Sequence, residues 1–192
     1  MTGRRGLSPE SVVATSTAIV ESDGVEALTL SRVAAELGVK PPSLYNHVDG
    51  LDSLRRDVAL AAVAELGDRL GSAAMGRSGR DAVRALAVAF RTYALEHPGL
   101  YELTTRARPD DPEYAAASAR PVEPVLAVLR GYDLDGTAAI HAARTLRSAL
   151  HGFVALELGG GFGLDVDIEA SFEWLVDRLA DTLEVTAAKA TR

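Results

Sequence analysis

Residues 28–48, LTLSRVAAELGVKPPSLYNHV, have the pattern of two short helices joined by a tight turn. The first helix is predicted from about residue 31 to residue 37, with Thr29 or Ser31 as its N-cap. Gly38 ends this helix, because glycine tolerates the left-handed backbone that caps a helix C-terminus. The turn at Gly38 leads directly into a second helix, so a helix pair is expected.

The second helix of the pair starts at Pro41 or Pro42, where the fixed φ of proline suits the first helical position, and runs to about His47. Leu44 and Val48 lie four residues apart and are expected to face inward. The outward set consists of Pro42, Ser43, Tyr45, Asn46 and His47. A short, exposed polar helix that is braced by another helix has the shape that enters the major groove of DNA.

This stretch resembles the helix-turn-helix of the TetR family of bacterial transcriptional regulators, whose pattern is LT-x-x-x-(V/I)-A-x-x-x-G-V-x-x-x-(S/T/P)-(L/F)-Y-x-(H/Y)-(V/F). The matching positions are Leu28, Thr29, Val33, Ala34, Gly38, Val39, Ser43, Leu44, Tyr45, His47 and Val48. So many matches at fixed spacing make the motif specific, and the alternative is an ordinary helical hairpin in a bundle. The resemblance implies DNA contacts from Thr29, Lys40, Pro41, Ser43, Tyr45, Asn46 and His47.

The amino-terminal arm carries Arg4 and Arg5, which either reach phosphates or a minor groove of DNA or are solvated charges. A first helix follows, with Ser8 as its N-cap and Pro9 at its first position, and it ends at Gly24. This helix supplies the packing support that the helix pair needs. Together the three helices are predicted to form a DNA-binding domain.

The composition favours helix, because alanine and leucine dominate and aromatic residues make up only 5% of the 192 residues. We therefore expect an all-α fold. The chain has no cysteine, which excludes disulfides and thiolate metal sites and fits a reducing cytoplasm. No apolar run approaches the ~18 residues that a membrane span needs, so a cytoplasmic protein without a membrane partner is expected.

The charge of the amino-terminal region is unusual for a DNA-binding domain. The chain has a formal net charge of −7, and residues 1–60 hold six Arg or Lys against eight Asp or Glu. The family resemblance implies a phosphate-binding lysine near residues 49–52, where this chain has none; Arg55 or Arg56 either replaces it or is solvated. DNA affinity is therefore expected to come from a local patch of cations rather than from bulk charge.

The chain is predicted to divide into a helix-turn-helix domain at residues 1–50, a connecting helix at 51–70 and a ligand-binding and dimerisation domain at 71–192. In the family that the chain resembles, the connecting helix transmits ligand binding to the DNA-binding domain. It is expected at about 52–70, and the small-residue segment 71–79 marks the boundary. The later helices are predicted at 80–96, 100–105, 113–119, 122–130, 136–158 and 168–183.

The last two of these helices are the candidate dimer interface. The first is apolar on nearly every side and carries a stripe of small residues, and the second has large apolar residues at near-heptad spacing. Two such helices from each of two subunits would form a four-helix interface in a homodimer. The predicted interface residues are Ser148, Gly152, Ala155, Phe172, Leu175, Val176, Leu179 and Leu183. The sequence LHGF at 150–153, followed by the glycine-rich run 159–163, resembles the WHG type of TetR C-terminal domain.

Two sets of residues are candidates for a small-molecule effector site. Arg144, Arg147 and His151 put a basic stripe on an otherwise apolar helix, which could hold an anionic group or pair with carboxylates of a neighbouring helix or subunit. The aromatic candidates, which line an apolar cavity or belong to the core, are Phe90, Tyr93, His97 and Tyr101.

These features predict a homodimeric transcriptional regulator, a repressor that a small molecule releases from a palindromic, double-stranded operator. One alternative is a dimeric helical interaction protein that has lost DNA binding, which the charge of residues 1–60 motivates. Another is a helical enzyme using His97, Tyr101, His141 or His151, but no nucleophile motif or paired-ligand spacing supports it. No catalytic residue, cofactor or metal site is therefore predicted.

Overall fold

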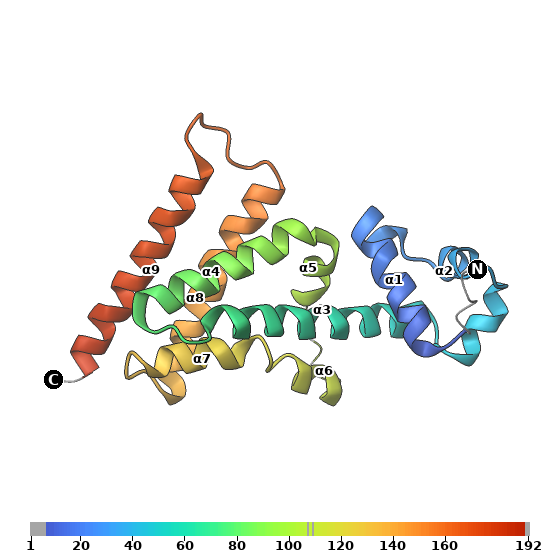
Figure 1. The fold of residues 1–192 in the computed structure, drawn as a ribbon, viewed down its shortest axis with the longest axis horizontal. Helices are drawn as coiled ribbons and strands as arrows, with labels where there is room; N and C mark the ends of the chain where they lie inside the picture. Colours follow the sequence, from blue (N-terminus) through green and yellow to red (C-terminus); the bar gives the residue numbers. More distant parts are fainter. Residues whose placement is uncertain (1–6, 107, 109, 191–192) are drawn as a thin grey trace. The chain divides into compact units, whose positions relative to one another are not determined.

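The computed structural model describes residues 7–106, 108 and 110–190, with side chains described as far as residue 186 (Figure 1). Each regular element in this part of the chain is a helix, which confirms the all-α prediction. The contacts group the chain into two compact units. The first combines the described part of residues 1–63 with that of 97–117, and the second combines 64–96 with the described part of 118–192.

This grouping differs from the predicted domains 1–50, 51–70 and 71–192. The division between the units falls inside α3 (Leu51–Ala74), and residues 97–117 return to the first unit. The segment 71–79, expected as a domain boundary, is still helical as far as Ala74. The backbone turns only at Gly76, whose φ is 71°, so the small residues before it extend the helix instead of breaking it.

The first unit contains α1 (Pro9–Asp23), the 3-10 turn η1 (Val25–Ala27), α2 (Leu30–Glu36), the 3-10 helix η2 (Pro41–Asn46), the start of α3, α5 (Pro98–Thr104) and α6 (Pro112–Ala117). The predicted start of α1 is confirmed as a capping box. The Ser11 amide donates to the Ser8 hydroxyl at 3.2 Å, and the Ser8 amide donates to the Ser11 hydroxyl at 2.9 Å. Gly24 ends α1, as predicted.

The hydrophobic core of the first unit draws on both of its segments. The helix-turn-helix region contributes Val12, Val20, Leu28, Val33, Leu44, Val48, Leu54 and Val58. Leu100, Leu103 and Tyr114 of α5 and α6 are buried in the same cluster. Residues 97–117 are therefore part of the core that supports the DNA-binding helices.

The second unit contains the rest of α3, α4 (Gly79–Glu96), α7 (Val122–Arg130), α8 (Gly136–Leu158) and α9 (Ile168–Ala190). Its helix α4 packs against α8 and α9, and α7 packs against α8. Figure 1 shows α8 and α9 as consecutive long helices joined by a loop. Across the described residues, none of the helices combines the length and the apolar character needed to cross a bilayer.

The structure corrects part of the predicted dimer interface. Phe172, Val176 and Leu183 are only 1%, 2% and 5% exposed, because they pack inside their own second unit. In the protomer they are therefore core residues, which leave little surface for a partner. The remaining predicted positions are half-buried at Leu175 and Leu179 and exposed at Ser148, Gly152 and Ala155.

Candidate nucleic-acid interface

The turn between α2 and η2 has the geometry that the sequence predicts. The Thr29 hydroxyl caps α2 by accepting from the Arg32 amide at 3.2 Å. At the other end Gly38 has φ 67°, and the Val39 amide donates to the Ala34 carbonyl at 2.9 Å. This is the Schellman arrangement, so the turn is fixed by backbone hydrogen bonds. The bounds of α2 match the predicted helix to within one residue at each end.

The second helix of the pair is a 3-10 helix rather than the α-helix that its spacing suggests. The Ser43 amide donates to the Lys40 carbonyl at 2.9 Å, and the His47 amide donates to the Leu44 carbonyl at 2.8 Å. Pro41 and Pro42 occupy the first two positions of this helix, where an amide hydrogen would have no acceptor within the helix.

Burial sorts the side chains of η2 as predicted. Leu44 is fully buried and Val48 is 5% exposed, whereas Tyr45 is 61% exposed. The other predicted DNA contacts are exposed at Thr29, Lys40, Pro41 and Asn46 and half-buried at Ser43 and His47. Except for Thr29, which caps α2, these residues are brought together on one short element. The remaining predicted contacts, Arg4 and Arg5, lie outside the described residues.

Two arginines of the first unit are occupied by acidic partners. The Arg32 guanidinium forms an ion pair with Asp23, whose pKa is lowered by hydrogen bonds from Ser22 and Arg32. The Arg56 guanidinium binds the Asp111 carboxylate through two nitrogens, with Nη2 at 2.9 Å from Oδ1. Arg56 also donates to Glu113 at 2.6 Å, so its guanidinium is already paired with two carboxylates.

Among the lysines and arginines of residues 28–56, Lys40 and Arg55 have no close acidic partner in the described part of the chain. No ion pair of Lys40 occurs among the described residues, and its side chain is exposed. The nearest acid to Arg55 is Asp52, at 3.9 Å and with its own side chain 98% exposed. The buried Nε of Arg55 has no hydrogen-bond partner. Arg55, unlike Arg56, therefore has only a distant acidic partner at the start of α3.

The aromatic candidates for an effector site fall into different units. Phe90 and Tyr93 belong to α4 in the second unit, where Tyr93 is fully buried beneath the Arg69 guanidinium. His97 and Tyr101 belong to the first unit, and His97 Nδ1 lies 2.6 Å from a Glu21 carboxylate oxygen. The role of these four residues in ligand binding stays a prediction.

The basic candidates on α8 are not inside the protomer. Arg144 and Arg147 are exposed and have no ion pair among the described residues, and His151 is half-buried. An interior pocket lined by the two arginines is therefore excluded for the single protomer. In the described part of the chain, no cluster of three or more His, Asp and Glu side chains could hold a metal ion.

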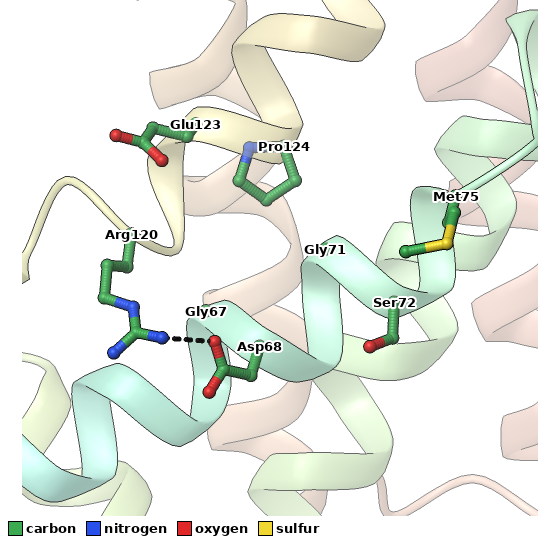
Figure 2. A pocket seen from close by; sticks show the side chains of 8 residues that line it. All are labelled: Gly67, Asp68, Gly71, Ser72, Met75, Arg120, Glu123 and Pro124. Atoms are coloured by element: carbon green, nitrogen blue, oxygen red, sulfur yellow. Dashed lines mark hydrogen bonds and ion pairs between the residues drawn. The ribbon is translucent and has the colours of Figure 1, made fainter.

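A groove of about 440 Å³, which was not predicted from the sequence, lies between the carboxyl-terminal half of α3 and the start of α7 (Figure 2). Arg120 donates to Asp68 at 2.5 Å at one end, and Met75 lies at the other. A Cβ atom on Gly67 would lie 2.8 Å from the Cβ of Arg120, whereas one on Gly71 would meet no atom within 4 Å. Gly67 is thus needed for packing, and Gly71 leaves the helix backbone uncovered in the groove.

A three-helix helix-turn-helix with an exposed polar row on its last helix, carried by a helical chain, defines a DNA-binding transcriptional regulator. Residues 83–179 match the family model described as a tetracyclin repressor-like C-terminal domain. The chain belongs to the TetR family of transcriptional regulators.

Relatives that match most of the chain carry the same class of name. The uncharacterized HTH-type transcriptional regulator Rv0681 of Mycobacterium tuberculosis is 44% identical over 180 residues, which cover 93% of this chain and 82% of the relative. The uncharacterized HTH-type transcriptional regulator YobS of Bacillus subtilis is 32% identical over 177 residues, covering 92% of each. The TetR variant of Acinetobacter baumannii AYE crystallised with minocycline has the same fold, with a TM-score of 0.72, 22% identity and coverage of 94% and 98%.

Proposed function

We propose that this regulator is a homodimeric repressor that binds a palindromic DNA operator and is released by a small molecule. The observation that carries the proposal is the polar row of η2, which is exposed to solvent while Leu44 and Val48 anchor it to the core. An element of this kind can enter the major groove without losing its support. The protein would then act in the cytoplasm, where an operator is accessible.

The residues of η2 divide into base-reading and backbone-binding groups. The flat ring of Tyr45 can contact a thymine methyl group, and Ser43 and Asn46 can reach base edges. Lys40 and His47 would bind phosphates, and Arg55 adds a further phosphate contact at the start of α3. In a two-fold dimer the two η2 helices would lie about 34–36 Å apart, one turn of the duplex.

Exposed residues of α8 and α9 support a dimer through these two helices. Ser148 and Gly152 leave space for close approach of another helix, and Ile140 and Leu156 on the same helix are 47% and 52% exposed. Trp174 of α9 is 66% exposed. Large apolar side chains exposed on two helices are typical of a surface that a partner covers. The family match does not distinguish subtypes of this domain. That residues 150–163 belong to the WHG type is part of our proposal.

The effector part of the proposal depends on a difference in affinity between two conformations of the dimer. A ligand that prefers the conformation unsuited to the operator would lower operator occupancy. The size of this effect is limited by the difference between the ligand's affinities for the two conformations. A protein of the same fold has been crystallised with minocycline. The second unit offers two candidate effector sites. One is the groove beside Gly71, and the other is the surface around the exposed Arg144 and Arg147.

The proposal is tested by titrating the protein against DNA from upstream of its own gene at several salt concentrations. We expect salt-dependent, saturable binding that Tyr45→Ala abolishes without changing the helical circular dichroism signal. Tyr45→Phe is the matched control, because it keeps the ring that contacts the bases. If the wild-type protein binds no such DNA at low or moderate salt, the alternative of a dimeric interaction protein that has lost DNA binding is favoured.

A further inference from the structure

Asp111 performs two tasks within the first unit. Its carboxylate accepts from the Tyr114 amide at 3.0 Å, which caps the start of α6. The same carboxylate binds the Arg56 guanidinium of α3 through two nitrogens, and Glu113 adds a third acceptor at 2.6 Å. One side chain therefore ties α6 to the first part of α3.

This polar clamp is partly shielded from water. The side chains of Arg56 and Asp111 are 25% and 19% exposed. A paired arginine and carboxylate with this degree of burial are held in a defined geometry. If they separated, each charge would be left unpaired where little water can solvate it. The guanidinium fork fixes the orientation of the two helices as well as the distance between them.

The apolar contacts around the clamp connect it to the DNA-binding helix. Leu54 and Val58 on α3 flank Arg56 in sequence and are fully buried. They belong to the same core cluster as Leu44 of η2 and Tyr114 of α6. A shift of α3 relative to α6 must therefore repack the residues on which η2 rests.

A second attachment holds the neighbouring helix α5 to α1. His97 Nδ1 lies 2.6 Å from Glu21, and Gly99 lies directly against the backbone of Val20. Residues 97–117 thus contact the DNA-binding region at both α1 and α3. Residues 97–117 therefore form a brace for the helix-turn-helix, although they come later in the sequence. Arg56 and Asp111, which join α3 to the brace, are 55 residues apart.

We infer that Asp111 is a positioning residue for DNA binding: through Arg56 it fixes the start of α3 and thereby the placement of η2. The inference rests on the proposed operator binding and adds to it a residue that touches no DNA. The neighbouring residues Arg55 and Arg56 then have different roles: Arg55 binds a DNA phosphate, whereas Arg56 binds Asp111 and touches no DNA.

The test compares operator affinity of Arg56→Gln, Asp111→Asn and the double variant with that of the wild type. Asparagine at residue 111 keeps the helix cap but removes the charge that holds Arg56. We expect each single variant to bind about three- to tenfold more weakly, and the double variant to be no worse than the weaker single one, because both remove the same interaction. The DNA is the duplex from upstream of the protein's own gene, used at a temperature where circular dichroism shows each variant folded.

Salt dependence separates positioning from direct contact. Arg56→Gln and Asp111→Asn should leave the slope of log affinity against log salt unchanged, whereas Arg55→Gln should lower it by about 0.9 for each subunit. Arg80→Gln, which breaks the ion pair with Asp181 in the second unit, is the matched control and should leave affinity unchanged. Should Arg56→Gln not fold, Asp111→Asn carries the comparison alone.

Two outcomes overturn the inference while leaving operator binding intact. One is wild-type affinity, within twofold, in folded Arg56→Gln and Asp111→Asn. The other is a reduced salt slope in Arg56→Gln, which would make Arg56 a phosphate contact. A wild-type protein that does not bind the duplex overturns the proposed function itself, and the inference with it.

Discussion

Gly99 lies so close to Val20 that a Cβ atom on residue 99 would be 2.5 Å from the Val20 carbonyl oxygen. The contact is between backbones, so no side-chain rotation can relieve it. Helix α5 can therefore approach α1 this closely only with glycine at residue 99.

Gly99→Ala is expected to destabilise the protein by about 1–3 kcal/mol, because the added methyl group forces α1 and α5 apart. The free energy of unfolding in urea measures this. Gly71→Ala is the matched control: its methyl group meets no atom within 4 Å, so the gain in helix propensity should raise stability by about 0.5–1 kcal/mol. Equal effects of the two substitutions would contradict the backbone contact.

Much of the fold could be predicted where local signals mark the ends of helices. Ser8, Pro9 and Gly24 delimit α1, and the glycines at both ends delimit α8, whose bounds agree with the prediction. The predicted end of the connecting helix, at about residue 70, was too early. Residues 71–74 continue α3, because a glycine inside a helix costs only about 1 kcal/mol relative to alanine.

In the candidate site too, features set by neighbouring residues could be predicted, whereas contacts between residues far apart in the sequence could not. The spacing of Leu44 and Val48 was enough to predict which side of η2 faces solvent. Periodicity alone could not tell that Phe172 and Val176 pack inside the protomer, because a buried face looks the same whether its neighbour is the same chain or another. The separate tasks of Arg55 and Arg56 were also hidden, since the Asp111 partner lies 55 residues downstream.

Lys40 should account for part of the salt dependence of DNA binding. Lys40→Gln is expected to lower the slope of log affinity against log salt by about 0.9 for each subunit, because one released counterion is lost. Arg32→Gln is the control, since the Arg32 charge is already paired with Asp23. A slope that falls equally in both variants would mean that Arg32 leaves Asp23 to bind DNA. Fluorescence anisotropy over a range of salt concentrations provides the measurement.

The stability of the first unit should depend on pH in the acid range. Hydrogen bonds from Arg56 and then the Tyr114 amide lower the pKa of Asp111 from 3.8 to about 2. A carboxyl group whose pKa is lower in the folded state stabilises the fold above its unfolded pKa, and that stabilisation is lost as pH falls toward about 2. Thermal unfolding of the wild type and Asp111→Asn should therefore differ most above pH 4 and converge below it. Parallel curves over this range would show that the ionised carboxylate contributes no stability.

Trp174 provides a direct test of the proposed dimer, because it is the single tryptophan of the chain and is 66% exposed in the protomer. A partner that covers α9 would remove water from the indole ring, so the emission should be blue-shifted at high protein concentration and should shift to the red on dilution. Gly152→Arg is the matched variant, since a side chain at that position meets no atom of its own protomer within 4 Å but would block an approaching helix. It should be monomeric in sedimentation experiments and red-shifted at every concentration. A wild-type dimer whose emission stays red-shifted would locate the interface away from α9.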